Sequence, residues 1–270
     1  MKGESKSLYF LYNNIVGLMI LKVIYNIWFS KFMGSLLNTR ISTLKIDGFV
    51  KKHNIDMPRF KKVKYKSFNE FFIRELRDNS VNQDNDTFIS PCDGNLLVHE
   101  INDKSEFEIK NFTYNVSTLL GTDNHRYHGG VCLIFRLEAT DYHRYCYIDN
   151  GVKGKNIFIK GKLHTVQDIA FDKFEVHHTN SREWTEMETD NFGTIIQVEV
   201  GALVVGKIEN YHEEYSFKRG EEKGRFEFGG STIIMLVEKD KIKINDEILT
   251  ASKHNIETHV FFGTKIGVKL

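Results

Sequence analysis

The sequence predicts an α+β protein that consists of an N-terminal helical arm followed by a β-rich body. The first observation is an apolar segment, residues 7–37, whose polar side chains recur with a helical period. The second is that this period disappears from Phe88 onward, where short β-branched runs are broken by Gly, Asp and Asn. Helices that precede the strands in this way are typical of the α+β class, and we expect two regions, 1–80 and 81–270.

Composition limits the classes of function that are open to this chain. Hydrophobic residues make up 41% of the 270 residues, which is enough for a sizeable core. Charged residues make up 27% and the net charge is +1, so the charge balance favours neither nucleic acid nor an acidic partner. Three cysteines without a C-x-x-C spacing argue against a disulfide framework and indicate a reducing compartment. The histidines lack a second ligand cluster at metal spacing, and no metal site is predicted.

The N-terminal segment can be interpreted in three ways. Residues 7–21 carry no charge, and no small-residue cleavage site of a signal peptide follows them. Lys22, Asn26 and Ser30 recur every four residues and would form a polar stripe on one otherwise apolar helix. This pattern predicts a helix that lies in the membrane interface, with its lysines facing anionic lipid. The alternatives are a helix packed on the protein's own core and a helix that spans the bilayer with residues 8–30.

A second helix and several strands follow the arm. In "KSFNEFFIREL", Ser67 and Glu70 form an S-x-x-E capping box that predicts a helix start, with Phe71 and Phe72 at helical spacing. This helix either extends the membrane-facing surface or packs in the core. Strands are predicted in "FISPCDGNLLVHE", "GGVCLIFRL", "GTIIQVEVGALVVGKI" and "STIIMLVEKDKIKI".

Three turns of the predicted body hold residues that can carry chemistry. Asp93 precedes a glycine in "SPCDG", His143 lies among tyrosines in "DYHRYCYIDNG", and Ser231 follows two glycines in "FEFGGSTIIML". Each has a structural interpretation as well, because Asp-Gly is a hairpin signal and glycines inside a strand usually mark a bulge. Together they supply the residue types of a nucleophile, a base and an orienting carboxylate.

These segments, in this order, resemble the phosphatidylserine decarboxylase proenzymes of the shorter bacterial type. The resemblance covers almost the whole chain and rests on "YKSFNEFFIREL", "ISPCDGNLL", "DYHRYCYIDNG", "FGTIIQVEVGALVVGKI" and "FKRGEEKGRFEFGGSTIIML". It implies a body similar to the barrel-sandwich fold of lipoyl domains. It further implies that the proenzyme cuts itself between Gly230 and Ser231, and that Ser231 becomes a covalent pyruvoyl group, the cofactor. His143 is implied as the base that activates Ser231, and Asp93 as the carboxylate that orients His143.

The resemblance also implies the reaction of the mature enzyme. The pyruvoyl group forms a Schiff base with the amine of phosphatidylserine and accepts the electrons released as carbon dioxide leaves, which gives phosphatidylethanolamine. His143 is our candidate for the acid that protonates the product. Many family members carry H-x-x-H at this place, whereas this chain has His143 followed by Cys146. Either His143 serves both steps or Cys146 replaces part of the second histidine, with His164 as a further candidate.

Partners and location follow from the same resemblance. The two chains, 1–230 and 231–270, are expected to remain associated, and a homodimer is expected by analogy. Because the substrate is a membrane lipid, we expect the protein to be peripheral on the cytoplasmic side of the cell membrane. Two alternatives stay open: a non-catalytic, uncleaved lipid-binding relative, and a decarboxylase of an ether lipid with a serine headgroup. A carrier module is disfavoured, since no modifiable lysine at a hairpin tip is present in the sequence.

Overall fold

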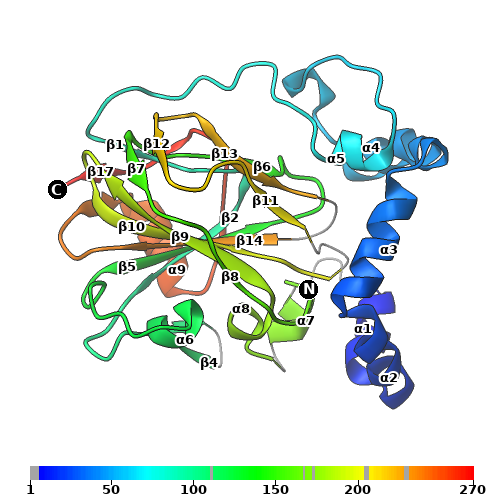
Figure 1. Cartoon of the computed structure of the whole chain (residues 1–270), viewed down its shortest axis with the longest axis horizontal. Helices are drawn as coiled ribbons and strands as arrows, with labels where there is room; N and C mark the ends of the chain where they lie inside the picture. The colour runs from blue at the N-terminus through cyan, green and yellow to red at the C-terminus, as the bar shows by residue number, and fades with distance from the viewer. Residues whose placement is uncertain (1–5, 110–111, 167, 172–173, 204–206, 228–230) are drawn as a thin grey trace.

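The computed structural model describes residues 6–109, 112–166, 168–171, 174–203, 207–227 and 231–270. A helical N-terminal region lies along one side of a β-rich body (Figure 1). This arrangement confirms the predicted mixture of helix and sheet and the predicted order of the two regions. The N-terminal helices are α1 Lys6–Asn13, α2 Ile15–Ile24, α3 Ile27–Leu37, η1 Arg40–Lys45, α4 Ile46–His53, η2 Met57–Arg59 and α5 Phe68–Phe72.

The prediction of one continuous apolar helix in the arm is wrong. Asn14 and Asn26 are the N-cap residues of α2 and α3, and the Asn14 side chain accepts a hydrogen bond from the Val16 N–H at 2.9 Å. Asparagine favours such caps because its side chain replaces a missing helical acceptor. The predicted polar stripe is therefore broken at Asn26, and Ser30 is buried. In the part of the chain described, no single helix is long and apolar enough to cross a bilayer. The helices Ser7–Asn13 and Ile15–Ile24 together have the length and the apolar composition of a membrane span, but they are bent by 103° relative to each other.

The capping box of the second predicted helix forms. The Ser67 hydroxyl accepts a hydrogen bond from the Glu70 N–H at 3.1 Å at the start of α5, as predicted. The three phenylalanines of this helix are buried: Phe68, Phe71 and Phe72. Of the two interpretations of this helix, packing in the core is therefore the one that the structure supports.

The described part of the body contains a nine-stranded antiparallel sheet. Its order is β12-β7-β9-β10-β14-β5-β2-β16, with β8 paired to β9. These strands are β2 Gly94–Glu100, β5 Val131–Leu137, β7 Gly151–Lys153, β8 Ile157–Ile159, β9 Arg182–Thr189, β10 Gly193–Val200, β12 Tyr215–Phe217, β14 Ser231–Val237 and β16 Thr258–Val260. The four segments predicted as strands all contribute to β structure. The run "STIIMLV" becomes β14, a central strand that is buried along its whole length.

Smaller sheets and short helices complete the body. Within the described residues, the smaller sheets have the orders β1-β17-β15, β11-β13-β6 and β3-β4. Their strands are β1 Thr87–Ile89, β3 Glu106–Ile109, β4 Phe112–Asn115, β6 Arg144–Cys146, β11 Ile208–Asn210, β13 Glu222–Phe226, β15 Ile242–Ile244 and β17 Lys265–Lys269. The helices are α6 Val116–Leu120, α7 Asp168–Phe171, α8 Val176–Thr179 and α9 Asp246–Lys253.

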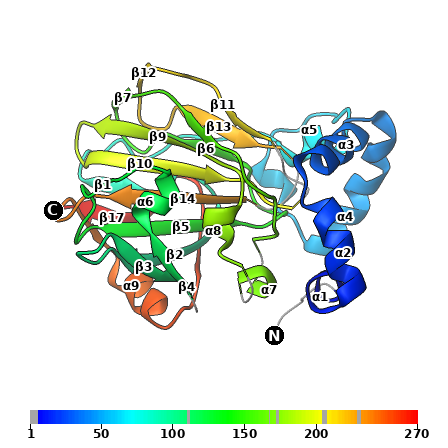
Figure 2. The ribbon, with the colours of Figure 1, turned by 60° about the horizontal axis from the view of Figure 1, so that its bottom comes forward.

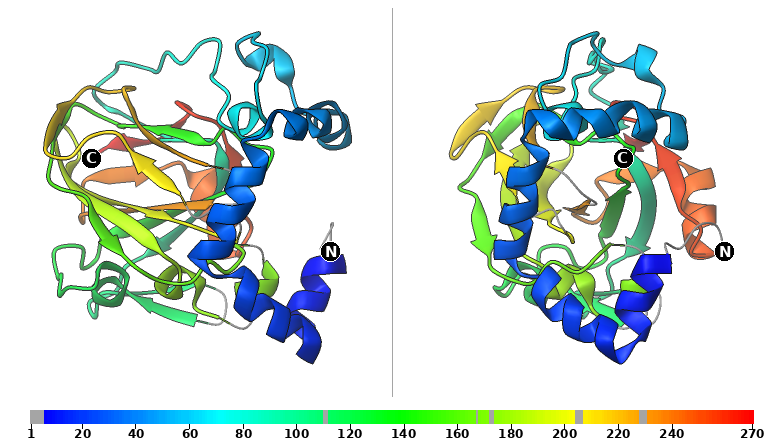
Figure 3. Two further views of the ribbon diagram at one scale, coloured as in Figure 1. Left: turned by 45° about the vertical axis from the view of Figure 1, so that its right-hand side comes forward. Right: turned by 90° about the vertical axis from the view of Figure 1, so that its right-hand side faces the viewer.

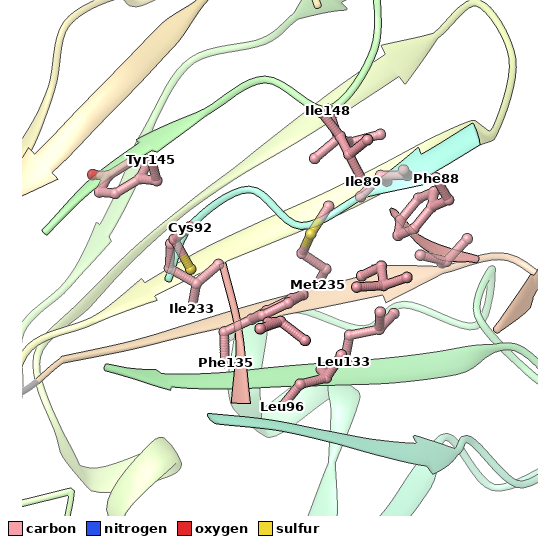
Figure 4. Packing of buried hydrophobic residues seen from close by; sticks show 14 of the residues in the cluster. Phe88, Ile89, Cys92, Leu96, Leu133, Phe135, Tyr145, Ile148, Ile233 and Met235 are labelled. Carbon is pink, nitrogen blue, oxygen red and sulfur yellow. The ribbon is translucent and has the colours of Figure 1, made fainter. Parts of the chain in front are cut away.

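Two apolar clusters lie on opposite faces of β14. Side chains alternate along a strand, so Ile233 and Met235 contribute to one cluster while Ile234 and Leu236 contribute to the other. The first cluster also contains Cys92 and Tyr145, and it lies between the large sheet and the segments that carry Phe88 and Ile148 (Figure 4). Ser231 is two residues before Ile233 and therefore lies on this face, whereas Thr232 faces the other.

The helical arm docks on the body at one end of the large sheet. Tyr12 of α1 and Leu21 of α2 share an apolar cluster with Ala202, which follows β10 by two residues. The Tyr12 hydroxyl lies 3.3 Å from Nδ1 of His164 and accepts a hydrogen bond from the Thr165 N–H at 3.1 Å. Figures 2 and 3 show α1, α2 and α3 across this end of the body. The last residue of β10, Val200, pairs with Thr232, so the helices lie at the end of the sheet where β14 begins.

Candidate functional site

Ser231 is the first residue of the central strand β14. It lies opposite Leu137, the last residue of β5, and is buried. Among the residues that the structure describes, no partner is found for the Ser231 hydroxyl. A buried hydroxyl without a partner is uncommon in folded proteins and is expected at sites of chemistry. The predicted cleavage partner, Gly230, lies outside the described residues.

The chain brings His143 to the same end of the sheet as Ser231. After β5, a turn is closed by the Asp141 N–H, which donates to the Glu138 carbonyl at 3.0 Å. His143 follows this turn, and its carbonyl accepts a hydrogen bond from the Phe226 N–H at 2.9 Å. Phe226 is the last residue of β13, five residues before Ser231. Both predicted residues are thus attached to the ends of neighbouring strands around the predicted cleavage segment.

The surroundings of His143 determine its tautomer. The side chain is buried, and its ring lies 3.8 Å, centroid to centroid, from the ring of Phe72. Its Nδ1 atom is 2.9 Å from the backbone carbonyl of Asp141. A carbonyl oxygen only accepts, so Nδ1 carries the proton and, in the neutral imidazole, Nε2 carries the lone pair. Nε2 is therefore the atom that can take a proton from a nucleophile.

Asp93 lies next to this segment but has partners other than the imidazole. Its carboxylate is buried and accepts hydrogen bonds from the backbone N–H groups of Tyr142 at 3.2 Å and Phe262 at 2.8 Å. The Arg59 guanidinium donates to both of its oxygens, at 2.5 and 2.7 Å. The resemblance implied that Asp93 orients His143. The structure brings Asp93 into contact with the residue before His143, while the Nδ1 partner is the Asp141 carbonyl.

The two cysteines near the site belong to the apolar core. Cys92 and Cys146 are both fully buried members of the cluster beside β14. Burial raises the pKa of the Cys146 thiol to about 12. The thiol therefore stays protonated near neutral pH and cannot act as a base in place of a second histidine. The further candidate, His164, lies in the contact between the arm and the body, where burial lowers its pKa to about 4.

Sequence reasoning missed Arg59 and the pair Asp141–His259. His259 Nε2 lies 3.2 Å from Asp141 Oδ1, and this hydrogen bond raises the pKa of His259. Strand β16, which carries His259, is three strands from β14 in the sheet, about 14 Å at the usual spacing. His259 is thus too distant to touch the Ser231 position from its strand. The sequence signal that was available is the D-Y-H triplet itself, in which Asp141 lies two residues before His143.

The site residues fit a group made from Ser231 and offer little to a metal ion. In the described ranges, no three His, Cys, Asp or Glu side chains lie close enough together to hold a metal. The Ser231 hydroxyl, by contrast, is buried at a strand end without a partner in the described ranges, and a carbonyl group made from the same residue would occupy this position. This arrangement can support self-cleavage before Ser231 and proton transfer by His143.

Comparisons with known proteins place most of the chain in one family. Residues 68–268 match a family model described as phosphatidylserine decarboxylase. Phosphatidylserine decarboxylase proenzyme 2 of Clostridium acetobutylicum is 44% identical over 269 residues, which are 98% of this chain and 92% of that protein. The proenzyme of Clostridium beijerinckii is 40% identical over 251 residues, 90% of this chain and 85% of that protein. The proenzyme of Clostridium botulinum strain Hall is 39% identical over 277 residues, 99% of this chain and 94% of that protein.

Proposed function

The chain belongs to the phosphatidylserine decarboxylase family, and we propose that it cuts itself before Ser231 and then converts phosphatidylserine to phosphatidylethanolamine. The observation that carries the proposal is the buried Ser231 hydroxyl at the start of β14, which has no partner among the described residues and lies at the same sheet end as His143. The activity is that of a carboxy-lyase of phospholipid synthesis.

The cut is an acyl transfer followed by an elimination. The Ser231 Oγ attacks the Gly230 carbonyl while His143 Nε2 takes the hydroxyl proton, and the peptide N–H of Ser231 becomes a free amine as an ester forms. Loss of the Ser231 Cα proton then breaks the Cβ–O bond, which releases the carboxylate of chain 1–230. Hydrolysis of the resulting enamine releases ammonia and leaves a pyruvoyl group on chain 231–270. Glycine suits position 230 because it has no side chain to obstruct the approach of the hydroxyl.

In decarboxylation, the pyruvoyl group supplies an electron sink for the carbon–carbon bond that breaks. The residues of this chain bind and orient the substrate, exclude water and move the proton. His143 lies on the aromatic face of Phe72 in a buried position, where the imidazole is protected from bulk solvent. It can return to the product carbon a proton that it has taken up, because an imidazole both accepts and donates near neutral pH.

We further propose that the two chains remain associated after the cut. Chain 231–270 supplies β14, which pairs with β10 on one side and β5 on the other. It also supplies β16 at the edge of the same sheet and the Phe262 N–H that binds Asp93. The interleaving of both chains in one sheet, stacked on smaller sheets, is the basis for proposing a barrel-sandwich relationship for the body. A homodimer stays a prediction.

The helical arm is proposed to hold the enzyme on the surface of the membrane, on the cytoplasmic side. Its exposed side chains include Trp28, 70% exposed, together with Ile15, Met19, Val23 and Phe32. Apolar patches of this kind on a surface mark interaction sites. Lys22 and Lys160 line a cavity of about 380 Å³ together with Trp28. These charges suit an anionic lipid headgroup, and the arm lies at the sheet end that carries Ser231, where a lipid would enter.

Intact-mass spectrometry of the purified protein tests the proposed cut. We expect two chains, the smaller starting with a blocked, pyruvoyl-derived residue and ending at Leu270. The Ser231→Ala variant should stay at 31.5 kDa and be inactive, because it lacks the hydroxyl that attacks. A full-length mass for active material would refute the proposal and favour the uncleaved, lipid-binding alternative. Decarboxylation assays on diacyl and ether forms of the serine lipid test the other alternative, a decarboxylase that acts on an ether lipid.

Vesicle binding tests the proposed location. We expect alkaline carbonate or high salt to release at least part of the protein from vesicles that contain anionic lipid, since an interfacial helix is held partly by charge. Release by detergent alone would show that the bent pair of α1 and α2 inserts across the bilayer.

A further inference from the structure

Arg59 reaches from the helical region into the site and occupies one edge of Asp93. Its Nη1 donates to Oδ2 at 2.5 Å and its Nη2 donates to Oδ1 at 2.7 Å, which is the two-pronged geometry of an arginine–carboxylate pair. Asp93 is 1% exposed, whereas the Arg59 side chain is 26% exposed. The carboxylate is therefore buried and its cation lies at the edge of the solvent.

All four acceptor positions of the Asp93 carboxylate are filled in this arrangement. Oδ1 accepts from Arg59 and from the Phe262 N–H, and Oδ2 accepts from Arg59 and from the Tyr142 N–H. An ionised carboxylate has about four lone-pair sites, so none remains for an imidazole. The effect of Asp93 on His143 must then pass through the backbone N–H of Tyr142, the preceding residue.

Three parts of the chain meet at this carboxylate. Arg59 belongs to the helical region, Tyr142 to the turn before His143, and Phe262 to segment 231–270. The apolar side chains around it form one cluster, in which Phe60 and Tyr142 are packed with Phe262. The Arg59 guanidinium also lies 4.7 Å from the centre of the Phe261 ring. Without Arg59, Asp93 would keep only two neutral donors, the backbone N–H groups of Tyr142 and Phe262, and its link to the helical region would be lost.

From this geometry we infer that Arg59 is a positioning residue for self-cleavage: it completes the four hydrogen bonds of Asp93, and through Asp93 and Tyr142 it fixes the backbone that carries His143. The inference rests on the proposed function, because self-cleavage is the process in which His143 is held to act.

The experiment follows maturation of the full chain made by cell-free translation, as the first-order rate at which the uncut chain disappears at neutral pH. We expect Arg59→Gln to mature at least tenfold more slowly, because Asp93 loses the two-pronged pair and the backbone before His143 is held less firmly. Arg59→Lys should recover part of the rate because it restores the charge without the two-pronged geometry. The control is Arg77→Gln, an exposed arginine whose backbone N–H donates to the Arg59 carbonyl, and it should mature at the unmodified rate.

A double variant tests whether Arg59 acts through Asp93. If it does, Arg59→Gln combined with Asp93→Asn should mature no more slowly than Asp93→Asn alone, because the second change removes nothing further. An unchanged rate for Arg59→Gln would overturn the inference, as would faster maturation, which would show that Arg59 restrains Asp93. If Arg59→Gln unfolds at a lower temperature in a Ser231→Ala background, the slow maturation of Arg59→Gln does not count, and the test is Arg59→Lys alone. Partial recovery of the maturation rate by Arg59→Lys supports the inference, and no recovery overturns it. A parent chain that never cuts itself refutes the proposed function instead.

Discussion

Removal of the buried cation Lys223 should destabilise the body strongly. Lys223 lies in β13 and Glu199 in β10; both side chains are fully buried, and Lys223 Nζ donates to Glu199 at 2.7 Å. The same ammonium donates to Asn210 Oδ1 at 2.7 Å. In Lys223→Met, Glu199 keeps two neutral donors, the amides of Gln197 at 2.8 Å and Asn210 at 3.2 Å. A buried charge has then lost its only charged partner among the described residues.

The size of the stability loss expected for Lys223→Met follows from this change in the partners of Glu199. Breaking a buried ion pair by removing one partner costs about 3–5 kcal/mol, more than removing an exposed pair, which costs about 0–1 kcal/mol. For a chain of this length, this corresponds to a decrease of about 10 °C in the unfolding temperature.

The assay is urea unfolding of uncut chains that all carry Ser231→Ala, so that one chain unfolds in each sample. Lys207→Met is the matched control, because Lys207 forms exposed ion pairs with Glu209 and Glu227. A loss below about 1 kcal/mol for Lys223→Met, or a loss equal to that of the control, would refute the argument.

Further expectations concern the site and its dependence on pH. His143→Ala should abolish maturation, because it removes the Nε2 atom that takes the proton. Cys146→Ser should mature at a rate within about tenfold of the parent rate, because the buried thiol takes no part in the chemistry. A Cys146→Ser chain that folds normally but stays uncut would contradict this. Asp93→Asn should slow maturation more than it slows decarboxylation by material already cut, measured by chain mass and carbon dioxide release. Burial lowers the pKa of His177 to about 3 and that of His99 to about 4, below the usual 6.5. Their contribution to stability is complete above pH 6.5 and is lost as pH falls toward these values, by about 1 kcal/mol per pH unit for each. A urea midpoint that does not change between pH 7.5 and pH 5 would be the contrary result.

Elements defined by local pattern could be predicted from the sequence. The run "STIIMLV" predicts a buried strand because β-branched residues without alternation suit a strand covered on both faces, and it forms β14. Ser67 predicts the start of α5 because a hydroxyl and a glutamate at this spacing satisfy the first helical N–H groups. Both signals depend on residues within a few positions of one another.

Features that depend on distant residues could not be predicted. Hydropathy alone does not show that Asn14 and Asn26 end one helix and begin the next, because the same side chains are tolerated on a helix surface. Arg59 lies in a basic stretch where solvent exposure is the usual expectation, and its partner Asp93 is 34 residues away. The carbonyl that fixes the His143 tautomer depends on a turn conformation that no residue type specifies.

The position of β14 changes the molecularity of folding. The uncut chain folds in a first-order process, because the strand that fills the middle of the large sheet is covalently attached to its neighbours. If the chain is cut before Ser231 as proposed, a denatured molecule must recover that strand from a separate 40-residue chain, so reassembly would be second-order and would depend on concentration. Folding would then be a step that each molecule completes before its chemistry begins, and slow unfolding would maintain the cut protein.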